Sequence, residues 1–300
     1  MLRIRLRPTG ELRRMLRSCC LFVALFPAVL PAQRLLAPED RPARAAAAKE
    51  LQLLLDDTPD LPTTVALAAV AGLPLPAGSA ARARLDQVLR AANTANEPER
   101  ARAALRRDLG GLVEVLAFRP RMEAERPQGF PEFGVVDELE LRDYPAYTMV
   151  RTTAKGGSTR AFWPLFQHIQ KNDIAMTTPV QMDWQPGQDG DRRPATMAFL
   201  YGDPATRPAH VAEGVEVVEV PAALVLSLGA IGNDRPAVVE AMLARLQGWL
   251  AANPAFEAAG PMRTMGYNSP MVPNDERYFE VQLPVRRRER APAPSESRGD

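Results

Sequence analysis

The sequence has little of the chemistry that most metal and redox sites require. Its 300 residues include only 2 cysteines and 2 histidines. Cys19 and Cys20 both lie in an N-terminal segment that has the pattern of a cleavable signal, so we expect no thiol in the mature chain. This excludes structural disulfides, cysteine nucleophiles and thiolate-bound metals or clusters. His168 and His210 are far apart and have no second histidine at helical spacing, which excludes a site with several histidine ligands.

The chain also lacks a surplus of either charge. Its 37 basic residues are balanced by 36 acidic ones, which leaves a net charge of +1. No broad electrostatic field therefore favours nucleic acid, and we expect no nucleic-acid partner. The hydrophobic content of 46% can support one main core and a smaller helical appendage.

The N-terminus has the order of regions that is typical of a secretory signal peptide. Arg13, Arg14 and Arg17 precede an apolar run at residues 20–30, which ends in small residues. The run is shorter than the roughly 20 apolar residues of a membrane span. We therefore expect residues 1–32 to direct export to the periplasm or the extracellular space, with no stable span after cleavage. An uncleaved signal would leave the protein associated with the membrane.

Residues 33–128 are predicted to form a small helical region and a linker. Alanine- and leucine-rich stretches at residues 42–55, 79–92 and 98–117 have helical character and are separated by turn residues. The proline- and charge-rich linker at residues 119–131 marks the boundary of the next domain. A spacer, a dimerisation arm and a partner-binding segment all remain open for the helices, and the protein partner is unknown.

From residue 133 the pattern changes to strands, in two halves of the same order. Each half reads strand, strand, helix, strand, strand, which indicates a duplicated unit. The fold class is therefore α+β: a twisted antiparallel β-barrel from two pseudo-repeated ββαββ halves with two flanking helices, preceded by the small helical region. Residues 286–300 are charged and rich in proline and serine, so we predict a disordered tail. Strands are expected at residues 139–142, 146–153, 176–184, 197–201, 215–220, 223–230, 262–269 and 278–285, and helices around residues 162–169 and 236–250.

Three motifs in this order resemble the SOUL or heme-binding protein family. They are Glu140-Leu-Arg-Asp-Tyr-Pro145, Met176-Thr-Thr-Pro-Val180, and Gly266-Tyr-Asn-Ser-Pro270 followed by Glu280. The resemblance covers residues 129–285 and implies a twisted barrel that binds heme or another tetrapyrrole. More distantly, the repeated unit resembles gyrase-inhibitor-like small-molecule-binding domains, some of which are hydrolases.

The resemblance also identifies a candidate position for an iron ligand. Some members of the family have a histidine just before the Tyr-Pro turn, and this sequence has Asp143 at the matching position. A carboxylate is an uncommon heme ligand, but other members are thought to hold the macrocycle by apolar contact alone. His168, near the edge of a predicted helical stripe, is the alternative axial ligand; a partly exposed helix histidine is the plain interpretation.

Several residue types suit a tetrapyrrole pocket. The flexible, polarizable side chains of Met149, Met176, Met182 and Met197 can line such a pocket, although ordinary core packing explains them as well. Arg151 and Arg263 are candidate partners for the two propionates, and surface exposure is the alternative for each. Tyr267 in the third motif is a further candidate ligand contact.

Glu280 is the acidic residue that coincides with a family motif. Strand alternation places it on the same face as Tyr278 and Gln282 and opposite Phe279 and Val281. It could contact a ligand or activate a water, as its counterpart does in the hydrolytic relatives that the resemblance implies; an outward-facing glutamate is the alternative.

Three functions follow. The leading hypothesis is an exported, non-catalytic SOUL-like protein that binds heme, another tetrapyrrole or another flat apolar molecule in an apolar groove of the barrel. The second is a small-molecule hydrolase of gyrase-inhibitor-like type that uses Glu280 with Tyr267 or Tyr278. The third is an interaction scaffold that recruits a partner through the N-terminal helices.

Overall fold

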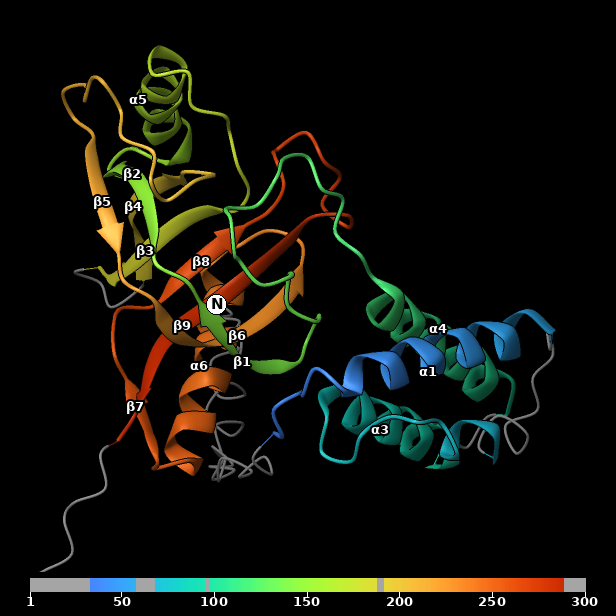
Figure 1. Ribbon diagram of the computed structural model, residues 1–300. Coiled ribbons are helices and arrows are strands. Elements are labelled where there is room, and N and C mark those ends of the chain that lie inside the picture. Colours follow the sequence, from blue (N-terminus) through green and yellow to red (C-terminus); the bar gives the residue numbers. More distant parts are fainter. Residues whose placement is uncertain (1–32, 58–67, 95–97, 188–191, 289–300) are drawn as a thin grey trace, which may run out of the picture. The chain divides into compact units, whose positions relative to one another are not determined.

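The computed structural model describes residues 33–57, 68–94, 98–187 and 192–288 (Figure 1). The predicted signal peptide at residues 1–32 therefore lies outside the described residues, as does most of the predicted tail. Within the described ranges, no helix has both the length and the apolar character needed to cross a bilayer.

The N-terminal region forms helices with a hydrophobic core of their own. Leu51, Leu85 and Leu109 are completely buried in this core. They come from three different helices, because the leucine spacing in each gives one apolar face that must be covered. The three predicted helices are therefore confirmed, each within about three residues. Their bounds are α1 Asp40–Asp57, α3 Ala80–Thr94 and α4 Pro98–Ala117.

The C-terminal half is one curled antiparallel sheet with the order β1-β6-β9-β8-β3-β4-β2-β5, in which β7 pairs beside β9. If each strand is replaced by its counterpart in the other half of the repeat, the same strand order is obtained, read in the opposite direction. The first strand of each half pairs with the second strand of the other half. The predicted duplication and the α+β barrel-like fold are confirmed as a curled half-barrel. The strands are β1 Leu139–Tyr144, β2 Tyr147–Thr153, β3 Val180–Pro186, β4 Arg192–Leu200, β5 Glu216–Val220, β6 Ala223–Ile231, β7 Phe256–Ala258, β8 Arg263–Gly266 and β9 Tyr278–Arg287.

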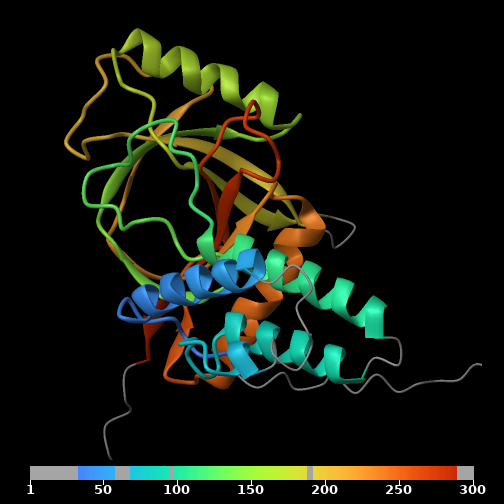
Figure 2. The same cartoon turned by 90° about the vertical axis from the view of Figure 1, so that its right-hand side faces the viewer.

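Two helices, α5 Ser158–Lys171 and α6 Pro236–Ala252, pack on one face of this sheet. Figure 2 shows α5, in yellow-green, on the outside of the curl. Along β9, alternate residues such as Phe279 and Val281 face the helices and form the main core. The residues between them, including Glu280, point to the other side, which we call the polar face.

The two proline-containing motifs meet at the centre of the sheet. Val180 on β3 is in register with Gly266 on β8, and the Thr178 hydroxyl donates to the Tyr267 carbonyl oxygen at 2.8 Å. The predicted strand start at Met176 is wrong, because β3 begins only at Val180. Before it, the hydroxyls of Thr177 and Thr178 donate to the Leu200 and Tyr267 carbonyls in place of a regular strand ladder. The short strand β7 was not predicted, and its pairing extends β9 to Arg287.

The segment at residues 118–138, which we call the strap, covers the polar face. Its Gln128 amide donates to the Gly202 carbonyl at 2.8 Å, and its Glu125 carbonyl accepts from the Thr178 amide at 2.9 Å. The Phe130 ring packs edge-on against Tyr144 and Tyr147, with centroid distances of 5.2 Å. The proline-rich linker is therefore part of the packed domain.

Candidate ligand-binding site

Glu280 lies at the middle of the polar face and is completely buried. The Arg142 Nη1 atom donates to both of its carboxylate oxygens, at 2.7 and 2.8 Å. The Gly134 amide of the strap donates to the same carboxylate at 2.7 Å. Alternation along β9 predicted this face correctly, and the alternative of an outward-facing glutamate is wrong.

The carboxylate of Glu280 is surrounded by further donors. Burial alone would raise its pKa, but the Arg142 guanidinium and the Gly134 amide hold the pKa at about 2. Glu280 is therefore a permanently ionised acceptor and a weak base at neutral pH, which does not favour activation of a water. Its other donors are Gln282 Nε2 at 2.7 Å, Ser227 Oγ at 3.0 Å, and the hydroxyls of Tyr278 at 3.1 Å, Tyr267 at 3.2 Å and Tyr144 at 3.3 Å.

Arg263 is a second buried cation on the polar face. Its Nε donates to Gln282 Oε1 at 3.0 Å and its Nη1 to the Tyr147 hydroxyl oxygen at 2.8 Å. The guanidinium also lies 5.7 Å from the centroid of the Tyr144 ring. Arg263, Tyr267 and Glu280, all predicted as ligand-contacting residues, thus belong to one hydrogen-bonded network.

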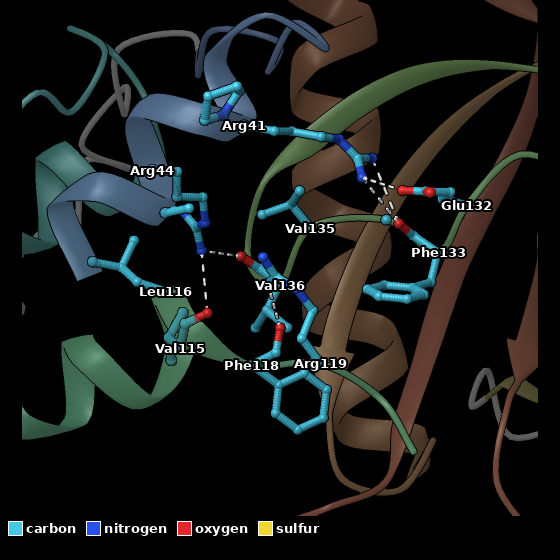
Figure 3. Close-up of a pocket in the computed structure, with 13 residues that line it drawn as sticks. Arg41, Arg44, Val115, Leu116, Phe118, Arg119, Glu132, Phe133, Val135 and Val136 are labelled. Atoms are coloured by element: carbon cyan, nitrogen blue, oxygen red, sulfur yellow. Dashed lines mark hydrogen bonds and ion pairs between the residues drawn. The ribbon is translucent and has the colours of Figure 1, made fainter. Parts of the chain in front are cut away.

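A cleft with a cavity volume of about 280 Å³ opens between the strap and the helices α1 and α4 (Figure 3). Phe118 and Phe133 in its wall pack against Tyr278, with ring centroids 6.1 and 5.9 Å apart. The Tyr278 hydroxyl lies 2.7 Å from the Gly134 carbonyl oxygen and 3.1 Å from Glu280, so this residue connects the cleft to the polar face. The lining residues are Arg41, Pro42, Arg44, Ala45, Val115, Leu116, Phe118, Arg119 and residues 132–136.

Arginine side chains give the cleft a cationic rim. Arg41 lies 2.7 Å from Glu140 and 3.8 Å from Glu132, so part of its charge is already matched. Arg119 is exposed, and its Nη1 donates to the neighbouring Phe118 carbonyl at 2.8 Å. The cleft therefore places guanidinium groups beside aromatic rings, as Figure 3 shows.

A buried ion pair fixes the helices that form one side of the cleft. Arg44 on α1 donates to Glu138 at 2.8 Å, and both side chains are almost fully buried. Glu138 also accepts from the Ala80 and Ala81 amides at the start of α3, at 2.9 and 3.0 Å. Burial raises the pKa of Glu138, and Arg44 with the two amides offsets this only in part. One carboxylate thus joins two helices to the strap.

The four candidate methionines do not share one site. Met149 on β2 packs on the polar face among Tyr144 and Tyr147. Met182 and Met197 are paired across β3 and β4 and face the helices, on the opposite side of the sheet. Met176 is only half-buried at the edge of that core. Strand alternation separates them, because successive side chains point to opposite faces.

The other predicted residues are also dispersed. His168 is 1% exposed, so the expectation of a boundary residue is wrong. It lies on α5 among residues of the main core, its Nε2 is 2.8 Å from the Tyr201 hydroxyl, and burial lowers its pKa. Asp143, at the position of the family histidine, is exposed on β1, and Arg151 pairs with Glu216 at 2.9 Å. In the described part of the chain, no three metal-ligating side chains gather.

The sequence interpretation missed several residues of this site. Arg142 lies within the first family motif, and alternation along β1 could have placed it on the same face as Glu140 and Tyr144. Arg41 and Arg119 carried no such signal, because their role depends on the way α1 and α4 approach the strap.

The comparisons with known proteins identify the domain. The family of SOUL heme-binding proteins matches residues 130–284, just over half of the chain, so the chain belongs to this family. No protein of curated function matches the sequence.

Several solved structures resemble the chain over about half of its length. The C-terminal domain of EcmrR is 12% identical, covers 50% of this chain and 98% of its own, and has a TM-score of 0.41. A hydrolase from Listeria innocua is 12% identical over 51% of this chain and 94% of its own, with a TM-score of 0.37. SAV2435 bound to tetraphenylphosphonium is 16% identical over 50% of this chain and 94% of its own, with a TM-score of 0.33.

Proposed function

We propose that this SOUL protein binds a tetrapyrrole, without catalysing a reaction, in the cleft between the strap and the helices. The observation that carries the proposal is the combination of Phe118 and Phe133 with Arg41 and Arg119 around one opening. Aromatic rings suit the flat apolar body of the macrocycle, and guanidinium groups suit its carboxylates. A volume of about 280 Å³ is just below the roughly 300–1,000 Å³ of typical ligand sites, so the ligand would lie partly exposed.

The lining residues fit the macrocycle but offer no ordinary iron ligand. No histidine, cysteine, methionine or tyrosine lies among the described residues that line the cleft. His168 is hydrogen-bonded to Tyr201 within the sheet domain, and Asp143 lies on β1, outside the cleft lining. We therefore expect iron to contribute little to affinity, so that hemin and iron-free protoporphyrin bind with similar dissociation constants.

Titration of the full-length protein with each pigment tests the proposal. Saturable changes in hemin absorbance and in protoporphyrin fluorescence are expected, with Kd values within a few-fold of each other. Arg119→Glu should weaken both by about tenfold, because it reverses a charge beside the carboxylates. The matched control is Arg121→Glu, an exposed strap arginine outside the cleft lining, which should change neither. Changes no larger than those of an unrelated protein, or equal effects of both substitutions, would overturn the proposal.

We further propose that the protein is exported, on the sequence pattern of residues 1–32. A mature N-terminus near residue 33 in protein recovered from the cell envelope supports export. Recovery of the intact N-terminus from the cytosol counts against it.

A further inference from the structure

Arg263 is a buried cation without a matching carboxylate. The residue is only 5% exposed, and no carboxylate among the described residues lies within ion-pair distance of its guanidinium group. Asp183, its register neighbour on β3, accepts from Gln181 and Thr196 instead. A buried charge is costly unless it is paired, and Arg263 reaches a carboxylate only through Gln282, which bridges it to Glu280.

Two buried donors on the polar face belong to guanidinium groups that both lie beside the Tyr144 ring. The Nη2 atoms of Arg263 and of Arg142 have no hydrogen-bond partner within the described ranges. Both guanidinium groups lie against the Tyr144 ring, 5.7 and 5.5 Å from its centroid. Arg142 is neutralised by Glu280, so the unmatched charge at this ring is that of Arg263.

We propose that Arg263 and Arg142 form a carboxylate-binding site at the Tyr144 ring, which takes a small carboxylate with a flat apolar body. The planar guanidinium suits the two oxygens of a carboxylate. The apolar body is indicated by Phe130, whose ring already packs edge-on against Tyr144 and Tyr147 beside Arg263. This site is separate from the cleft of Figure 3, whose lining contains neither arginine.

Phe130 belongs to the strap, so the strap controls access to this site. A ligand ring would take the place of the Phe130 ring between the two tyrosines, while its carboxylate meets the free Nη2 atoms. Affinity in the intact chain is then reduced by the cost of moving Phe130. A Phe130→Ala variant should bind more tightly, because the aromatic position is already vacated.

The test uses benzoate as the probe and the thermal midpoint of the full-length protein as the readout. Benzoate should raise the midpoint saturably, with acetate weaker because it lacks the ring. Sodium chloride at equal ionic strength and the neutral benzyl alcohol should not produce this rise. Arg263→Gln should weaken benzoate at least about tenfold, whereas Arg151→Gln, on a partly exposed sheet arginine that pairs with Glu216, should leave it unchanged.

Two results would overturn the proposal: an equal rise with chloride, or no saturable rise with benzoate in both the natural protein and Phe130→Ala. The chloride comparison and the two benzoate titrations test the proposal even if Arg263→Gln does not fold. Competition between benzoate and protoporphyrin for one site would also contradict it, since the two sites are separate. Failure of the tetrapyrrole proposal leaves this test unaffected, because the cleft variants do not touch Arg263.

Discussion

Two buried ion pairs, one in the sheet and one at the helical region, have almost the same geometry. Arg142 and Glu280 are 2.7 Å apart, Arg44 and Glu138 are 2.8 Å apart, and all four side chains are at most 5% exposed. Their carboxylates nevertheless differ in acidity. Burial opposes ionisation in both, but the pKa of Glu280 ends at about 2, whereas that of Glu138 ends above its ordinary value.

The difference lies in the other donors that surround each carboxylate. Besides its arginine, Glu280 accepts from an amide, a serine, a glutamine and three tyrosines. Glu138 has two amides at the start of α3 and a long contact of 3.5 Å from Gln33. The desolvation of a buried charge is offset only when enough donors replace the lost water. Distance within an ion pair is therefore a poor guide to its strength.

The largest expected loss of stability comes from breaking the buried ion pair of the sheet, Arg142 with Glu280. Arg142→Met should lower the free energy of unfolding by about 3–5 kcal/mol, because Glu280 stays buried without its cation. Urea unfolding followed by circular dichroism measures this. Arg151→Met, which breaks an exposed pair with Glu216, should cost at most about 1 kcal/mol. Similar losses for the two variants would show that the sheet pair contributes no more than a surface pair.

The fold and the central carboxylate could be predicted because their signals are local. Period-two alternation in β9 is enough to place Glu280 on the face opposite Phe279 and Val281. The repeated order of strands and helix is likewise a local signal, and it is enough to predict that the sheet is built from two duplicated halves. Neither inference requires knowledge of which strands pair.

The rest depends on contacts between residues that are distant in the sequence. Arg142 and Glu280 are 138 positions apart, and Arg44 and Glu138 are 94 apart. The partner of the buried His168 is Tyr201, which directly follows β4, and helical periodicity cannot reveal this contact. The proline and charge of residues 119–131 predict a linker, yet the Gln128 amide there donates to the Gly202 carbonyl at 2.8 Å.

Acid should destabilise the protein through protonation of Glu280. The pKa of Glu280 falls from 4.5 to about 2 on folding, so its contribution is complete above pH 4.5 and is lost as the pH falls toward 2. The loss amounts to roughly 3 kcal/mol of unfolding free energy over this window. The carboxyl carbon resonance of Glu280 should titrate near pH 2, and a midpoint at or above 4.5 would show that its donors do not outweigh burial. The pH dependence should be weaker by the same amount in Glu280→Gln.

The smallest of the three losses of stability is expected at the ion pair of the helical region, Arg44 with Glu138. Arg44→Met should cost about 2 kcal/mol, less than the sheet variant, because Glu138 keeps two amide donors and can take up a proton. The loss should be smaller at pH 5 than at pH 8, since a raised pKa favours the protonated, folded state in acid. Urea unfolding at the two pH values measures it.

Hydrogen exchange shows where this loss is located. Faster exchange in α1 and α3, with β9 unchanged, is expected because Glu138 joins those helices to the strap. Arg41→Met is the comparison variant, as Arg41 lies one turn away on α1 and is itself 30% exposed, although its partner Glu140 is buried. It should cost less than Arg44→Met, because Glu140 keeps the Val135 amide as a donor and Arg41 is already open to water. If Arg44→Met instead accelerated exchange in β9, the two ion pairs would support one cooperative unit, and their different acidities would not separate the helices from the sheet.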